Sequence, residues 1–178
     1  MQIVLATRNK GKIRELERIL AVTLPDVELL GTDSFPELSD IEETEDSFEG
    51  NALLKARAVA TFTQLPAIAD DSGLCVDFLN GDPGIFSARW AGSHGNDAAN
   101  TEKVLQQLDG VPQNQRGAHF TCVAALYLPD GRSHCEEAEF HGSILLTPIG
   151  DHGFGYDPIF QPAGYAISSA QMSAEEKD

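Results

Sequence analysis

Long apolar runs are absent from this sequence, so no stretch of it predicts a helix that crosses a bilayer. A secretory signal is missing too, because the N-terminal MQIVLATRNKGK places its apolar residues before its basic ones and has no small-residue cleavage site. Both absences argue against the membrane and secreted classes. We therefore expect a cytoplasmic protein that makes no contact with membranes.

Cysteine is scarce, and the spacing of Cys75, Cys122 and Cys135 matches no metal-binding motif. An odd count without an export signal argues against a disulfide framework, so we expect reduced cysteines in the core or in strands. The five histidines form no HExxH pattern, and no Ser/His/Asp order stands out. A zinc hydrolase or a nucleophilic triad therefore has little support.

Basic residues are few, since 12 Lys and Arg against 28 Asp and Glu give a formal net charge of −16. Nucleic-acid binding depends on basic patches that neutralise phosphates, so this charge argues against DNA or RNA as a partner. A phosphate-bearing ligand would need a few placed cations or a metal ion. The 178 residues, 42% of them apolar, suffice for one core, and we expect a single domain over residues 1–178.

Hydrophobic periodicity predicts the first half of the fold. Ile3–Ala6 reads as a short buried strand, and the apolar residues that follow recur at helical spacing. A second strand is expected within residues 26–33. Asp46 with Glu49 resembles a capping box, which predicts a helix that ends near Leu65–Pro66. Its apolar face consists of Phe48, Ala52, Ala56 and Val59.

The second half is expected to complete a mixed sheet. Residues 67–70 form a strand that a Ser72-Gly73 turn would end, and a helix is expected over residues 98–108. Residues 119–128 are β-branched and aromatic enough for a central strand. The following Pro-Asp-Gly turn and a return strand over residues 132–141 predict a hairpin, so the sheet is not purely parallel.

Residues 7–12, TRNKGK, lie where the first strand leads into the first helix. Free backbone N–H groups and the helix dipole favour an anion there, and Lys12 can reach a phosphate. This is no Walker A loop, because no glycine precedes Gly11 at the required spacing and Ile13 replaces the magnesium-binding hydroxyl. Phosphate binding and a plain solvated turn both stay open on this spacing.

Two adjacent carboxylates, Asp70 and Asp71, close the apolar AIADD stretch. At about 4 Å they would repel by roughly 4 kcal/mol at an effective dielectric near 20, so positive partners are expected. Side chains alternate along a regular strand, so one carboxylate could hold a cation while the other faces a reacting water. Glu43 is a further oxygen ligand suited to Mg²⁺. A solvated surface acid is the alternative for each residue.

Asn51 and Lys55 are one helical turn apart and share a face of the predicted second helix. Lys55 could pair with the two aspartates or contact a phosphate. A solvent-facing lysine is the alternative, and the spacing leaves both open.

The stretch Gly153-Phe154-Gly155-Tyr156-Asp157-Pro158 holds an aromatic ring between two glycines. Such a ring is suited to stacking on a planar ligand, and Asp157 offers an acceptor beside it. A carboxylate can accept from the purine N1–H that hypoxanthine and xanthine carry and adenine lacks. The alternative is an ordinary loop with a half-buried phenylalanine.

Five stretches together resemble the inosine triphosphate pyrophosphatases, which hydrolyse dITP, ITP and XTP to the monophosphate and pyrophosphate. These stretches are ATRNKGKIREL, SFEGNALLKARAVA, PAIADDSGLCVD, PGIFSARWAG and GFGYDPIF, and they span nearly the whole chain. The resemblance implies a mixed, strongly twisted α/β sheet flanked by helices in two lobes, with the substrate in the cleft between them. It also implies Mg²⁺ as the cofactor and a homodimer.

The resemblance implies roles for individual residues. Asp71 is expected to activate the attacking water, with Asp70 and Lys55 as further catalytic residues. Glu43, Asp70 and Asp71 are expected to bind magnesium. The expected nucleotide-binding set consists of Thr7, Asn9, Lys12, Ser72, Phe154, Gly155, Tyr156, Asp157 and Lys177.

The sequence departs from the family pattern after the expected capping box of Ser173 and Glu176, because it stops at Asp178. We expect it to lack the last helix and the Ser-His-Arg segment that completes the base pocket in the family. Two alternative functions stay open. The septum-inhibitor-like nucleotide pyrophosphatases also open with a strand, a polar turn and a basic residue, and a non-catalytic nucleotide-binding protein would keep the same motifs.

Overall fold

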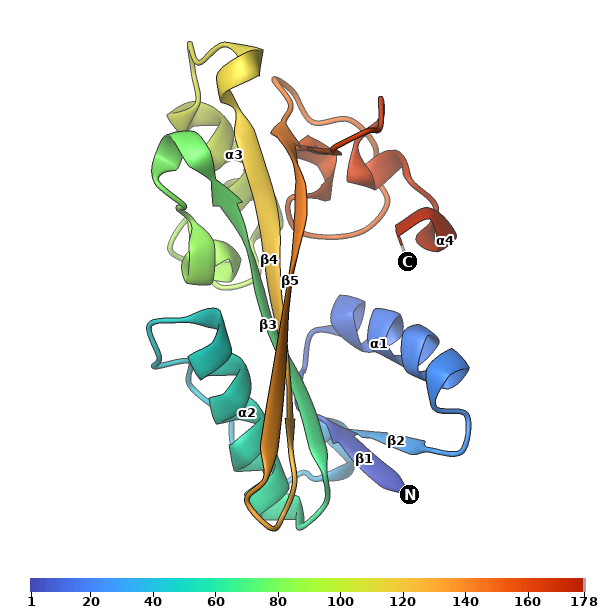
Figure 1. The fold of residues 1–178 in the computed structure, drawn as a ribbon. Helices are drawn as coiled ribbons and strands as arrows, with labels where there is room; N and C mark the ends of the chain where they lie inside the picture. Colours follow the sequence, from blue (N-terminus) through green and yellow to red (C-terminus); the bar gives the residue numbers. More distant parts are fainter. Residues whose placement is uncertain (178) are drawn as a thin grey trace. The chain divides into compact units, whose positions relative to one another are not determined.

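The structure, a computed structural model, describes residues 1–177 and the side chains of all of these except Lys10, Glu15, Ala174 and Lys177. Figure 1 shows the order of the elements along the chain. The strands are β1 (Gln2–Leu5), β2 (Glu28–Gly31), β3 (Ala67–Val76), β4 (Gly117–Tyr127), β5 (Ser133–Ile144) and β6 (Phe160–Pro162). The helices are α1 (Lys10–Thr23), α2 (Phe48–Thr63), α3 (Asp97–Gln107) and α4 (Ala174–Lys177). Short 3₁₀ helices lie at Thr32–Ser34, Asp77–Leu79, Gly84–Arg89, Gln113–Gln115, Asp157–Ile159 and Ser169–Gln171.

The strands form one curled, six-stranded sheet in the order β2-β1-β3-β4-β5-β6. β1 runs parallel to β2 and to β3, whereas β5 and β6 are antiparallel. This change of direction confirms the mixed α/β sheet. None of the described helices combines the length and the apolar character that a membrane span requires.

The chain divides into two compact units. The first contains residues 1–71 and 122–137, and the second contains residues 72–121 and 138–178. β3, β4 and β5 each contribute residues to both units. The two units agree with the two lobes expected, while one functional domain over the whole chain stays a prediction.

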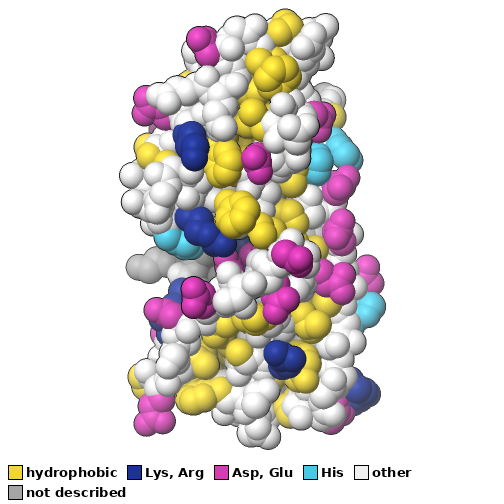
Figure 2. All heavy atoms as spheres, turned by 90° about the vertical axis from the view of Figure 1, so that its left-hand side faces the viewer, with side chains coloured by type: hydrophobic (Ala, Val, Ile, Leu, Met, Phe, Trp, Pro, Cys, Tyr) yellow, Lys and Arg dark blue, Asp and Glu magenta, His cyan; other side chains and the backbone are white. Residues whose placement is uncertain are grey.

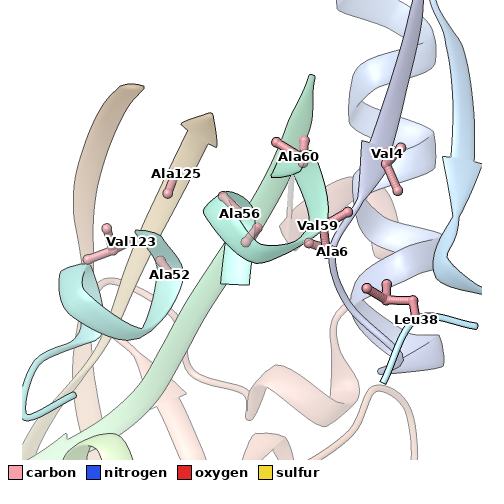
Figure 3. Close-up of a cluster of buried hydrophobic side chains, with 11 residues drawn as sticks. Val4, Ala6, Leu38, Ala52, Ala56, Val59, Ala60, Val123 and Ala125 are labelled. Carbon is pink, nitrogen blue, oxygen red and sulfur yellow. The ribbon is translucent and has the colours of Figure 1, made fainter. Parts of the chain in front are cut away.

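Each unit has its own hydrophobic core. In the first unit, α2 buries the face that the sequence predicted, and Ala52, Ala56 and Val59 are fully buried against Val123 and Ala125 of β4 (Figure 3). Small residues on this face let the helix lie close to the sheet. The second core gathers the apolar side chains Leu74, Val76, Val104, Leu108, Ile144, Ile159 and Phe160.

The third strand is longer than the sequence pattern predicted. The turn expected at Ser72-Gly73 is wrong, because β3 continues through these residues to Val76. Leu74 and Val76 are fully buried, and burying each such side chain stabilises the fold by about 1.5–3 kcal/mol. That burial outweighs the weak strand propensity of a glycine.

The second helix begins with a different cap from the one expected. Ser47, not Asp46, is the N-cap of α2, and its Oγ accepts a hydrogen bond from the Gly50 N–H at 3.1 Å. The helix ends at Thr63, close to the predicted Leu65–Pro66. The other expected elements, the helix after residue 96 and the β4–β5 hairpin, are confirmed.

The acidic excess of the sequence is displayed on the surface. Figure 2 shows Asp and Glu side chains at many places along one face and Lys and Arg at fewer. In contrast, the side chains of Lys12 and Lys55 are only 18% and 13% exposed. Lys12 and Lys55 are therefore largely buried cations, and their contacts indicate where a functional site could lie.

Candidate active site

Residues 7–12 form a self-capped helix start. Asn9 is the N-cap of α1, and its Oδ1 accepts hydrogen bonds from the N–H groups of Gly11 at 2.9 Å and Lys12 at 3.3 Å. Thr7 Oγ1 accepts from the Asn9 N–H at 3.2 Å. This turn holds Lys12 with its Nζ 2.6 Å from Asp70 Oδ2. The phosphate contacts expected for Thr7, Asn9 and Lys12 stay predictions.

Lys55 of α2 joins two carboxylates. Its Nζ lies 2.9 Å from Glu43 Oε1 and 2.9 Å from Asp71 Oδ1. The Asp71 side chain is only 8% exposed, so water and salt screen the pair little. The sequence left open whether Lys55 pairs with acidic residues or faces solvent. In the structure it pairs with acidic residues.

Asp70 and Asp71 are neighbours in β3, yet their carboxylates meet different helices. Asp70 pairs with Lys12 from α1, and Asp71 pairs with Lys55 from α2. Figure 1 shows these two helices on opposite faces of the sheet. The alternation of side chains along a regular strand thus separates the two charges and gives each its own cation. This confirms the expectation that positive groups offset the repulsion.

Burial shapes the electrostatics of the Asp71–Lys55 pair. It raises the pKa of Asp71 above the usual value of 3.8, and the nearby Lys55 offsets this only in part. Burial would lower the pKa of Lys55, but the carboxylates of Asp71 and Glu43 outweigh it, so that pKa is raised. One ammonium therefore serves two carboxylates. A carboxylate with a raised pKa is a stronger base, as a proton acceptor requires.

Carboxylate oxygens suited to a divalent cation lie beside Lys55. Asp71 Oδ2 is buried and has no hydrogen-bond partner among the described residues. Mg²⁺ prefers such oxygen ligands, and Glu43 brings a second carboxylate to the same ammonium. Among the side chains that the structure describes, no three of His, Cys, Asp or Glu are arranged to hold a metal, and Asp70 pairs with Lys12 of α1. The donor chemistry fits Mg²⁺, and the metal stays a proposal.

Asn51 links the acidic segment to α2. It is fully buried, and its Oδ1 accepts a hydrogen bond from the Glu45 N–H at 3.0 Å. This bond holds the backbone two residues after Glu43, whose carboxylate reaches Lys55. The sequence placed Asn51 and Lys55 on one face but did not predict this contact, because it depends on the path of an irregular segment.

The aromatic loop of residues 153–158 lies in the second unit. Phe154 is 38% exposed, and its N–H donates to Asp157 Oδ2 at 3.1 Å. Tyr156 is buried, and its hydroxyl donates to the Ser87 carbonyl at 2.9 Å. Burial raises the pKa of Tyr156, so the hydroxyl stays protonated as a donor. The Tyr156 ring thus anchors the loop in the core, while the Phe154 ring stays accessible to a ligand.

Two residues of α3 hold this loop and were not predicted. Asp97 Oδ2 accepts a hydrogen bond from the Gly155 N–H at 2.8 Å, and the Thr101 hydroxyl donates to the Gly155 carbonyl at 3.4 Å. An aspartate in the first turn of a helix is favoured by the helix dipole alone, so the sequence held no signal for this contact. The same loop and α3 line a pocket of about 500 Å³.

The structure thus describes the expected residues in two groups, each within its own unit. Glu43, Lys55 and Asp71 come together in the first unit, as do Lys12 and Asp70. The second unit carries the aromatic loop and the half-buried Ser72 of β3. The Lys177 side chain lies outside the described residues.

Two smaller expectations are confirmed. The Ser173 N–H donates to Glu176 Oε2 at 2.8 Å and the Glu176 N–H donates to Ser173 Oγ at 3.3 Å, so the capping box is present. The three cysteines lie in β3, β4 and β5, and they form no disulfide within the described part of the chain.

Comparison with known proteins places this arrangement in a family. A dITP/XTP pyrophosphatase of Streptomyces avermitilis is 53% identical over 177 residues, which cover 99% of this chain and 88% of that protein. The crystal structure of a nucleoside-triphosphatase and dITP/XTP pyrophosphatase from Mycobacterium abscessus is 48% identical, with a TM-score of 0.83 over 100% of this chain and 92% of that one. The structure of the Staphylococcus aureus Ham1 protein is 41% identical in sequence, with a TM-score of 0.87, and the match covers 99% of this chain and 89% of that one.

These similarities confirm the resemblance that the five sequence stretches indicated. The model of the Ham1 family matches residues 3–178. The chain therefore belongs to the Ham1 family.

Proposed function

We propose that this chain hydrolyses the non-standard purine nucleotides dITP, ITP and XTP to the monophosphate and pyrophosphate, which removes them from the nucleotide pool. The observation that carries the proposal is the Asp71 carboxylate, held by Lys55 through one oxygen and buried at the other. Relatives that share about half of this sequence are named dITP/XTP pyrophosphatases, which supports the same activity here. The family match favours this function over that of the septum-inhibitor-like group.

Asp71 would act as the general base. Its Oδ2 would accept a proton from water as the water oxygen attacks the α-phosphorus. The bond between the α-phosphorus and the bridging oxygen then breaks, and pyrophosphate leaves with the electron pair. Lys55 keeps the carboxylate in place, and Lys12 would neutralise charge on the phosphate tail.

Magnesium would bind where the carboxylate oxygens gather. Glu43 and Asp71 are the residues placed to hold it beside Lys55, and Asp70 is the third residue that the family resemblance implies. When bound, the ion would supply positive charge that offsets the negative charge of the phosphates. The protein's own contribution is to hold these carboxylates in a sheltered site.

The loop of the second unit would select the base. The exposed Phe154 ring would stack on the purine, and Asp157 would accept from the N1–H of hypoxanthine or xanthine. Ser72, Gly155, Tyr156 and Lys177 stay proposed members of the nucleotide-binding set. We also propose a homodimer located in the cytoplasm.

One experiment tests the activity against its alternatives. The protein is incubated with dITP, ITP, XTP, ATP, GTP or dTTP, with Mg²⁺ or with a chelator, and pyrophosphate and orthophosphate are measured separately. We expect pyrophosphate from dITP, ITP and XTP, and only with Mg²⁺. Orthophosphate alone contradicts the proposal. Nucleotide binding without turnover favours a non-catalytic nucleotide-binding protein.

A further inference from the structure

The loop that carries Phe154 depends on unusual backbone conformations. Gly153 and Gly155, on either side of the ring, have φ values of +79° and +60°. A glycine reaches this region without the cost that other residues meet, but it also leaves the unfolded loop with more conformational freedom to lose. The position of the Phe154 ring therefore has to be set by contacts outside the two glycines.

An open pocket adjoins both the loop and α3. The pocket of about 500 Å³ is lined by Leu105 of α3 on one element and by Pro148, Gly153 and Phe154 of the loop segment on the other. Because Phe154 lines this open pocket, its ring is not enclosed by packed side chains on that side. Packing against α3 therefore does little to fix the ring.

Polar contacts supply the missing support. The Gly155 N–H donates to Asp97 Oδ2 at 2.8 Å, and the Gly155 carbonyl accepts from the Thr101 hydroxyl at 3.4 Å. Thr101 is buried at 6% exposure, so its short side chain has little freedom. One residue of the loop is thus held at both of its backbone polar groups by one face of α3.

These bonds adjoin the residues proposed to read the base. Gly155 directly follows Phe154, and the Phe154 N–H in turn donates to Asp157 Oδ2 at 3.1 Å. A shift of the Gly155 peptide would therefore move both the ring and the carboxylate. On the C-terminal side, the buried Tyr156 hydroxyl bond to Ser87 keeps the chain from following such a shift.

We propose that Asp97 and Thr101 are positioning residues for substrate selection, because α3 clamps the Gly155 peptide and so sets where Phe154 and Asp157 meet the purine base. This inference rests on the proposed function. Neither residue needs to touch the substrate. Their loss should weaken substrate binding and the discrimination between purine bases. The chemical step should stay unchanged, because the general base Asp71 and the lysines Lys12 and Lys55 belong to the other unit.

The first test is structural and needs no substrate. Amide hydrogen exchange is followed in the peptide that contains Gly155, in the wild-type protein and in Asp97→Ala. Loss of the acceptor should speed exchange of the Gly155 amide by about three- to ten-fold, the lower range for a hydrogen bond that is partly exposed to water. Asp97→Asn keeps a side-chain acceptor and should restore most of the protection.

The second test measures substrate selection. KM and kcat for dITP and dGTP are determined for the wild-type protein, Asp97→Ala, Asp97→Asn and Thr101→Val. We expect Asp97→Ala to raise KM for dITP by about three- to ten-fold with kcat little changed, and to narrow the preference for dITP over dGTP. Glu102→Gln is the matched control, because Glu102 lines the same pocket and bonds to Gln106 of its own helix.

The outcomes separate the inference from the proposed function. Unchanged exchange and unchanged KM in Asp97→Ala overturn the inference, as does an equal effect of Glu102→Gln. If the wild-type protein releases no pyrophosphate, the proposed function fails. The dissociation constant for dITP then replaces KM, and a Kd unaffected by Asp97→Ala, or no binding at all, overturns the inference.

Discussion

The Lys55 ammonium lies 2.9 Å from one oxygen of Asp71, while the other oxygen of that carboxylate is buried and has no hydrogen-bond partner within the described part of the chain. The ion pair fixes the carboxylate, and the second oxygen can still accept a hydrogen bond or a proton. A buried acceptor of this kind costs free energy, typically about 1–3 kcal/mol, unless a ligand or water satisfies it. Such a cost is expected at a site where a substrate water or a metal completes the arrangement.

Replacing Asp71 by Asn should separate binding from chemistry. The amide keeps the size of the side chain but is a far weaker base, so kcat for dITP should fall by about 10²–10⁴-fold. KM should change less than kcat, because Lys12, Glu43 and the residues proposed to contact the purine stay in place. The measurement is pyrophosphate release, with the surface variant Asp26→Asn as the control. A near-normal kcat in Asp71→Asn would rule out Asp71 as the general base.

The pH dependence of kcat should report the Asp71–Lys55 pair. Burial raises the pKa of Asp71 above 3.8, so kcat should fall as acid protonates the carboxylate at a pH above that value. Lys55 partly opposes the rise, so Lys55→Met should move the midpoint of the acid limb to higher pH. Arg57→Met, an exposed change on the same helix, serves as the control. An acid limb that does not move contradicts the coupling.

The same pKa shift has a defined sign for stability. The folded protein binds more protons at Asp71 than the unfolded chain does between pH 3.8 and the raised pKa. The contribution of Asp71 to the free energy of unfolding should therefore decrease as pH rises through that window. Chemical denaturation across this pH range should show a steeper decline in the wild-type protein than in Asp71→Asn.

Arg116 should be a main support of the second unit. Arg116 is 2% exposed, and its guanidinium donates to the carbonyls of Leu108, Ile144 and Leu145 at 2.8, 2.9 and 3.0 Å. Arg116→Met would remove the donor to the Leu145 carbonyl, while the Leu108 and Ile144 carbonyls would keep the Val111 N–H and the Gln113 amide. The loss of these charged contacts should lower the free energy of unfolding by about 2 kcal/mol, measured by urea denaturation.

Two matched variants test that explanation. Arg116→Lys keeps the charge but offers a single nitrogen, so the loss should be smaller. Arg132→Met removes an exposed ion pair with Asp130 and should change stability by less than about 1 kcal/mol. Equal effects of the changes at Arg116 and Arg132 would contradict the role of the buried carbonyl contacts.

The cap of α2 offers a test of local structure. Ser47→Ala removes the side-chain acceptor for the Gly50 N–H and should destabilise the protein by about 1 kcal/mol. Asp46→Ala removes the residue that the sequence pattern favoured as the cap, and should have a smaller effect in the same thermal or urea unfolding measurement. The reverse order would mean that Asp46 caps the helix in solution.

Local patterns in the sequence predicted most helices and strands because each depends on nearby residues. The apolar spacing of Ala52, Ala56 and Val59 predicted the buried face of α2, and the Pro-Asp-Gly turn predicted the β4–β5 hairpin. The end of β3 was missed at Ser72-Gly73, because the burial of Leu74 and Val76 depends on distant partners. Local turn signals carry no information about such burial.

The sequence by itself determined the family motifs, the mixed sheet and the need for cations beside Asp70 and Asp71, because repulsion between adjacent carboxylates follows from their spacing alone. Only the tertiary structure decided that Lys12 forms an ion pair with Asp70, that Lys55 forms one with Asp71, and that Asp97 accepts a hydrogen bond from Gly155. The physical reason is that a side-chain contact depends on where two separate elements pack. That packing is set by burial summed over the whole core and not by any short stretch of residues.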